Sequence, residues 1–103
     1  MEVRAFRGTR RTSVYCGHRL SDDDFARIHE AAAARGLPLL ASLKPHEAHE
    51  LDKDDAYRLA EEMTDVRRSG DVPDLDADLT AITEVARWCA RATKRSWMRI
   101  EGP

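Results

Sequence analysis

Four residues in the sequence have types and spacing that suit the binding of a metal ion. His46 and His49 are three positions apart, and two imidazoles at this spacing can bind one metal from a single helical turn. Cys16 and His18 could supply two further ligands if their segment lies nearby. The pattern is not that of the H-E-x-x-H peptidases, because position 50 is a glutamate, and the histidines follow a proline, so the segment need not be helical. The four residues form a candidate metal site, with solvated loop histidines as the alternative.

Other patterns that could do chemistry are weaker. Cys16 and His18 could act as thiol nucleophile and base, although their spacing says little about how the two side chains meet. Cys89 lies in an apolar helical row and is expected to be a packed thiol. The sequence has no glycine-rich phosphate loop and no G-x-S-x-G motif. We therefore predict no catalytic residue and no cofactor, and favour a protein that is not an enzyme.

Charge is distributed unevenly along the chain. Residues 1–20 carry a net charge of +4, residues 21–86 of −10 and residues 87–103 of +4, for a total of −2. Helix dipoles explain part of this, because acids are favoured where helices start and bases where they end. Weak surface ion pairs between the ends and the middle are a second explanation. If the two ends meet in space, however, their bases form one surface.

That basic surface is a candidate site for nucleic acid or another anion. Aromatic residues, among them Phe6, Tyr15 and Trp97, are interleaved with the bases, and this mixture is typical of proteins that bind single strands. We expect Trp88 to lie in the core. The predicted binding residues are Arg4, Arg7, Arg10, Arg11, Arg87, Arg91, Arg95, Arg99 and Trp97, the arginines at 87, 91 and 95 sharing one helical face.

The acidic middle of the chain favours the opposite kind of partner. Asp54, Asp55, Glu61 and Glu62 could contact a basic protein, as in small acidic proteins that neutralise basic enzymes. A solvated helix face is the alternative for these carboxylates. Our preferred interpretation is a small regulatory or protein-interaction domain without enzymatic activity, with nucleic-acid binding as the alternative. Pairing of sheet edges could also make the protein a homodimer.

These side chains must be positioned by strands at both ends of the chain. Residues 2–16 read as a two-stranded hairpin that turns near Gly8, because valine, tyrosine, phenylalanine and threonine suit a pleated surface. A third strand is predicted at residues 37–43, followed by a polar connection at residues 44–50. Residues 97–101 alternate and predict a last strand with Met98 and Ile100 pointing inward.

Three helices are predicted between the strands. The first starts at Ser21 as N-cap and ends before Gly36, and the second starts near Asp52 and ends before Gly70. The third begins at Asp74 or Asp76 and runs to about residue 94. Its wide apolar face predicts that it packs on two sides as the central helix.

The resulting order, β-β-α-β-α-α-β, predicts an α+β fold with a sheet of about four strands and helices mainly on one face. A chain of 103 residues with 42% apolar and 35% charged residues is expected to form a single domain over residues 1–103. No apolar run is long enough to cross a bilayer and no secretory signal is visible, so we expect no membrane partner and a cytoplasmic location. Fourteen arginines against three lysines suggest a GC-rich bacterial genome.

Overall fold

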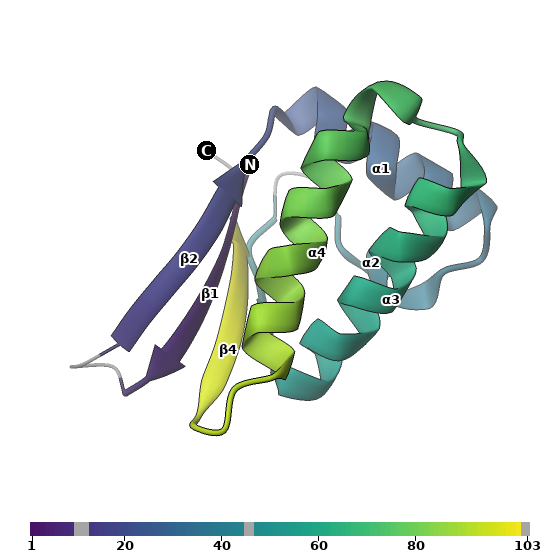
Figure 1. Cartoon of the computed structure of the whole chain (residues 1–103). Coiled ribbons are helices and arrows are strands. Elements are labelled where there is room, and N and C mark those ends of the chain that lie inside the picture. The colour runs from purple at the N-terminus through teal and green to yellow at the C-terminus, as the bar shows by residue number, and fades with distance from the viewer. Residues whose placement is uncertain (10–12, 45–46, 102–103) are drawn as a thin grey trace.

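The chain folds as an α+β structure in which helices pack on one face of an antiparallel sheet (Figure 1). The computed structural model describes residues 1–9, 13–44 and 47–101. The strands are β1 (Glu2–Gly8), β2 (Ser13–Arg19), β3 (His49–Leu51) and β4 (Ser96–Glu101). The helices are α1 (Asp22–Ala34), α2 (Pro38–Ser42), α3 (Lys53–Ser69) and α4 (Asp76–Ala90), with a 3-10 turn, η1 (Pro73–Leu75), leading into α4. The predicted fold class is confirmed.

The two ends of the chain meet in the middle of the sheet. The strand order is β2-β1-β4-β3, and every neighbouring pair is antiparallel. β1 pairs with β2 as the predicted hairpin and with β4 on its other side, with Phe6 opposite Trp97. The two basic ends of the chain therefore lie side by side, which was the condition for a shared basic surface.

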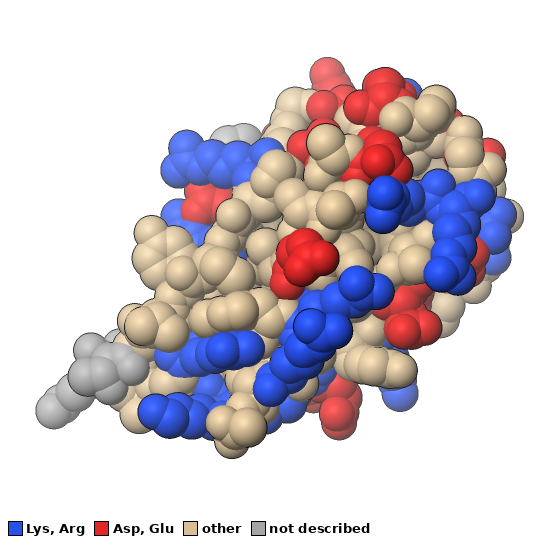
Figure 2. Space-filling model, in the orientation of Figure 1, with Lys and Arg blue, Asp and Glu red and all other residues tan. Residues whose placement is uncertain are grey.

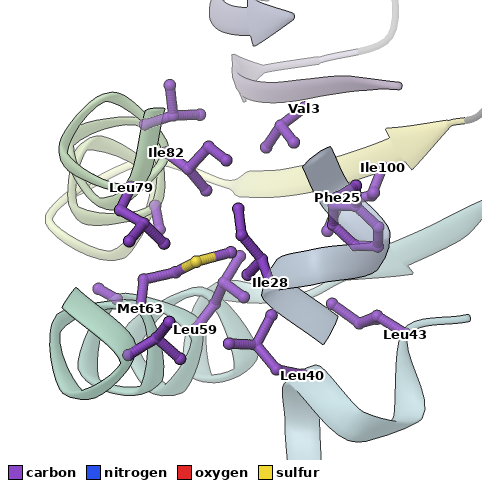
Figure 3. Packing of buried hydrophobic residues seen from close by; sticks show 14 of the residues in the cluster. Val3, Phe25, Ile28, Leu40, Leu43, Leu59, Met63, Leu79, Ile82 and Ile100 are labelled. Atoms are coloured by element: carbon purple, nitrogen blue, oxygen red, sulfur yellow. The ribbon is translucent and has the colours of Figure 1, made fainter. Parts of the chain in front are cut away.

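One hydrophobic core lies between the sheet and the helices (Figure 3). Val3, Met98 and Ile100 point from the sheet into this core, as predicted for the last strand. α4 packs against α3 on one side and against β1, β2 and β4 on the other, which confirms its central position. Burial of so many aliphatic side chains supplies the main driving force for the fold.

Local sequence signals set the ends of α1 and α3. The Ser21 side chain accepts a hydrogen bond from the Asp24 N–H, and the Asp52 side chain accepts one from the Asp55 N–H, as N-caps do. Gly36 and Gly70 follow the two helices with φ of 70° and 74°, a left-handed conformation that suits glycine. The predicted boundaries of both helices are thus confirmed.

The segment predicted as a third strand is instead the short helix α2. Alternation of Leu39, Ala41 and Leu43 suggested a strand, but Leu40 and Leu43 are the buried residues, three positions apart as on a helix. The Glu62 carboxylate accepts the Leu39 and Leu40 N–H groups at 3.1 and 2.8 Å. A contact from another helix therefore stabilises the start of α2, and a local pattern could not show it.

The third strand lies a few residues later, in the segment predicted as a polar connection. β3 is three residues long and pairs with β4, with Leu51 buried opposite Met98. Such a short edge strand carries too little alternation to be read from the sequence.

α4 ends at Ala90, earlier than the predicted end near residue 94. The Lys53 ammonium donates to the carbonyls of Ala92 and Lys94 at 2.7 and 3.2 Å, and the Ser96 hydroxyl donates to the Cys89 carbonyl at 2.8 Å. These contacts hold the chain in a turn after the helix. Arg95 consequently lies next to β4 and not on the helical face predicted for it.

Within the described part of the chain, no helix is both long and apolar enough to cross a membrane.

Candidate nucleic-acid interface

The sheet has an open face on the side away from the helices (Figure 1). Side chains of a strand alternate between the two faces, so those that flank the buried Val3, Met98 and Ile100 belong to this open face. The strand register brings the open-face residues into lines across the sheet. The first line is Tyr15, Phe6 and Trp97, and the second is Gly17, Arg4, Arg99 and, on β3, Glu50.

The first line is a row of three aromatic rings, here called the aromatic row. The ring centroids of Tyr15 and Phe6 are 5.9 Å apart, and those of Phe6 and Trp97 are 5.4 Å apart with an angle of 15° between the planes. Cross-strand aromatic pairs of this kind stabilise a sheet. Tyr15 is nevertheless 67% exposed, so the row ends in a large apolar side chain that lies in solvent.

Guanidinium groups flank the aromatic row. Arg95 lies over the Trp97 ring with its Cζ 5.7 Å from the ring centroid, in a cation–π contact. Arg4 and Arg99 face each other in the adjacent line, although like charges opposite each other are unfavourable. A hollow in this face is lined by the same arginines and aromatic rings together with a serine and a carboxylate, namely Phe6, Ser13, Glu50, Arg95, Trp97 and Arg99.

Carboxylates two residues away on the same strands offset the repulsion between Arg4 and Arg99. Arg4 forms an ion pair with Glu2, and Arg99 forms one with Glu101 at 2.8 Å. The arginine side chains remain 42% and 50% exposed, and exposed ion pairs of this kind are worth about 0–1 kcal/mol. A phosphate could therefore replace the carboxylate as partner at little cost.

Arg7, one of the predicted binding residues, does not lie on the open face. Its Nε donates to the Trp88 carbonyl at 3.1 Å, and its guanidinium lies 4.0 Å from the centroid of the Trp88 ring. Trp88 was expected to lie in the core; it is partly buried and packs against the core from its edge. Arg7 thus binds the end of α4 to β1, and we assign it a structural role.

Arg87 and Arg91 also lie apart from the aromatic row. Arg87 lines a hollow between α3 and α4, together with Arg67 and Arg68, and Arg91 is the C-cap of α4. Figure 2 shows basic side chains over the end of the molecule at which α4 leads into β4. The predicted binding set is therefore divided, with Arg4, Arg95, Arg99 and Trp97 on the open face. Arg10 and Arg11 lie outside the described residues.

The four predicted acidic residues do not form one surface, because Glu62 is buried. Its carboxylate is used to cap α2, as described above. Asp54 and Asp55 lie in the first turn of α3, where the helix dipole favours negative charge, and Glu61 is exposed.

The structure also separates the candidate metal ligands. Cys16 and His18 lie on β2, and His49 lies on β3 at the opposite edge of the sheet, three strand spacings or about 14 Å away. The His18 Nε2 is 2.7 Å from an Asp78 carboxylate oxygen. Among the described residues, no group of three or more His, Cys, Asp and Glu side chains could hold a metal ion. His46 lies outside the described residues.

Neither cysteine is poised as a nucleophile. Burial raises the pKa of the Cys16 thiol and also that of the Cys89 thiol above the ordinary value. A raised pKa keeps the thiol protonated near neutral pH, and the thiolate is the reactive form. The packed position predicted for Cys89 is confirmed.

Sequence reasoning missed which aromatic residues lie together and what Glu62 and Lys53 do. The alternation of each strand could have indicated the aromatic row, because Phe6 and Trp97 each lie between inward-pointing residues and therefore share the opposite face. The roles of Glu62 and Lys53 depend on contacts between distant helices and loops and have no local signal.

Comparisons of the chain with protein-family models, with curated proteins and with solved structures found no match.

Proposed function

We propose that the open face of the sheet binds single-stranded nucleic acid. The observation that carries the proposal is the aromatic row Tyr15–Phe6–Trp97, which lies beside Arg95, Arg4 and Arg99 on a face that the helices leave uncovered. Aromatic rings can stack on bases of any sequence, and nearby guanidinium groups can contact phosphates. This is the second of the two functions expected from the sequence.

The aromatic row favours single strands over a duplex. The bases of a single strand are free to turn their faces toward aromatic side chains, whereas those of a duplex are already stacked on one another. In the part of the chain that the structure describes, the open face presents rings on strands and no projecting helix that could enter a major groove. We therefore expect binding with little sequence preference and with strong dependence on salt.

The burial of Glu62 weakens the case for an acidic surface that neutralises a basic protein. A partner cannot contact this carboxylate without displacing the N–H groups of α2. The remaining predicted residues, Asp54, Asp55 and Glu61, are spread along α3, and they are explained in part by the helix dipole.

The test is a titration of a fluorescently labelled oligonucleotide, single-stranded or duplex, followed by anisotropy. Tyr15→Ala should weaken binding of the single strand between about fivefold and about 150-fold, because stacking on one base is worth about 1–3 kcal/mol. Tyr57→Ala is the matched control, since Tyr57 is 62% exposed but lies on α3, and it should bind like the unmodified protein.

Two results would overturn the proposal. One is the absence of any salt-dependent binding of single strands by the unmodified protein. The other is an equal loss of affinity in the two tyrosine variants, which would move the site away from the sheet. Preferential binding of duplex would also contradict the role given to the aromatic row.

A further inference from the structure

The outer edge of β2 is a long strand edge with few of the features that prevent strands from pairing. β3, at the other edge of the sheet, is only three residues long, whereas β2 has seven. Residues 13–17 of β2 contain no charged residue and no proline, and Val14 is 64% exposed. Proteins normally protect such edges with charges, prolines, bulges or short strands.

The hydrogen bonds next to β1 show which residues of β2 face outward. The Leu20 N–H donates to the Met1 carbonyl at 3.1 Å, and the Gly8 N–H donates to the Arg95 carbonyl at 2.9 Å. Because hydrogen-bonding residues alternate in antiparallel ladders, Val14, Cys16 and His18 turn their backbone groups toward β1. The outward backbone groups of β2 therefore belong to Ser13, Tyr15, Gly17 and Arg19.

We propose that β2 pairs antiparallel with β2 of a second copy of this chain, centred on Cys16, and that the dimer completes the nucleic-acid site. This inference rests on the proposed function. An antiparallel register must place residues whose backbone groups face outward opposite each other. When Cys16 lies opposite Cys16 of the second copy, this condition is met and all seven residues of β2 are paired. This register places Tyr15 opposite Gly17 of the second copy and Ser13 opposite its Arg19, so no like charges meet.

The pairing would continue the aromatic row of one copy into the second line of the other copy, which contains Gly17, Arg4 and Arg99. In each copy Gly17 lies in line with Arg4 and Arg99. With Tyr15 beside the Gly17 of the second copy, the aromatic row is followed along the same line by the two arginines of that copy. A side chain at position 17 would meet the Val3 carbonyl oxygen at 2.9 Å and the Arg4 Cγ at 3.3 Å, so the Arg4 side chain lies over Gly17 and at this junction. A strand stacked on the row would thus meet phosphate-binding groups from both chains.

Disulfide formation at Cys16 tests the register of the two β2 strands directly. At the centre of the pairing, the two Cys16 residues form a pair without hydrogen bonds, in which the Cα atoms are about 4.5 Å apart. A disulfide can form at this separation. Oxidation of the protein with copper phenanthroline and oxygen should join two chains through Cys16. Cys16→Ser should abolish the crosslink, and Cys89→Ser should not, because Cys89 is buried in the core.

The oligomeric state is tested by sedimentation over a wide range of protein concentration. The unmodified protein should reach twice the 11.7 kDa mass of the chain, and Val14→Lys should remain monomeric because it places a charge on the edge. Tyr57→Lys introduces the same charge on α3 and should still dimerise. A protein that is monomeric throughout, or a dimer unaffected by Val14→Lys, would overturn the proposal. So would a dimer in which Cys16 does not crosslink.

Oligonucleotide titrations of the Val14→Lys monomer separate this proposal from the proposed function. Loss of two arginine–phosphate contacts should reduce the slope of log affinity against log salt by about 1.4. A monomer that binds with unchanged slope would leave the proposed function intact and overturn the shared site. A crosslinked dimer that binds no strand would overturn the proposed function and leave only the strand pairing.

Discussion

Glu62 illustrates how a residue chosen by charge can have a structural role. It lies on α3 between exposed and buried positions, and its carboxylate accepts the N–H groups of Leu39 and Leu40. Helix α2 has no side-chain cap of its own, so this carboxylate takes the place of one. Arg7 is a similar case, since its guanidinium binds the Trp88 carbonyl and ring instead of a ligand.

Replacement of Glu62 by alanine should therefore lower the free energy of unfolding by about 2–4 kcal/mol, because one buried and one partly buried N–H group lose a charged acceptor. Guanidinium-induced unfolding measures the change. Glu61→Ala is the matched control. The Glu61 carboxylate is exposed, so its removal should change the free energy of unfolding by less than about 0.5 kcal/mol. Equal stability of the two variants would refute the capping role.

At the scale of elements, the turn after α4 determines where Arg95 and Trp97 lie. α4 ends at Ala90, and the Lys53 ammonium at the start of α3 holds the carbonyls of Ala92 and Lys94. A positive charge next to the end of α4 is also favoured by the helix dipole. The loop thereby brings Arg95 over Trp97 at the beginning of β4.

Lys53→Met should destabilise the protein by about 1–2 kcal/mol, because the loop carbonyls lose a charged donor. Thermal unfolding followed by circular dichroism tests this, with Lys94→Met as control. Lys94 contributes only its carbonyl to the contact, so its variant should unfold like the unmodified protein. An unchanged Lys53→Met protein would show that the loop needs no such contact.

The sequence predicted those elements whose boundaries depend on local signals. Ser21, Asp52 and the glycines at 36 and 70 define α1 and α3, and alternation places Met98 and Ile100 in the core. α2 and β3 could not be predicted, because one is capped by the distant Glu62 and the other is only three residues long. The sequence also predicted four residues of the candidate site, namely Arg4, Arg95, Arg99 and Trp97. Their position beside Tyr15 follows only from the pairing of the strands.

At the scale of the whole molecule, the two faces of the sheet have different roles. Both chain ends contribute strands to the sheet, so Arg4, Arg95 and Arg99 share the open face with the aromatic row. The helices hold the core together from the other side, and several of their charges are paired, as in Arg27 with Asp74 and Arg67 with Asp76.

The most direct measurement uses the two tryptophans, one near each side of the sheet. Trp88→Phe leaves Trp97 as the only tryptophan, on the open face, and Trp97→Phe leaves only Trp88, against Arg7 and the core. Addition of a single-stranded oligonucleotide should quench the fluorescence of the Trp88→Phe protein in a saturable way that weakens with salt, because a base stacks near Trp97. The Trp97→Phe protein should change little. Quenching of Trp88 alone, or of neither tryptophan, would contradict binding at the open face.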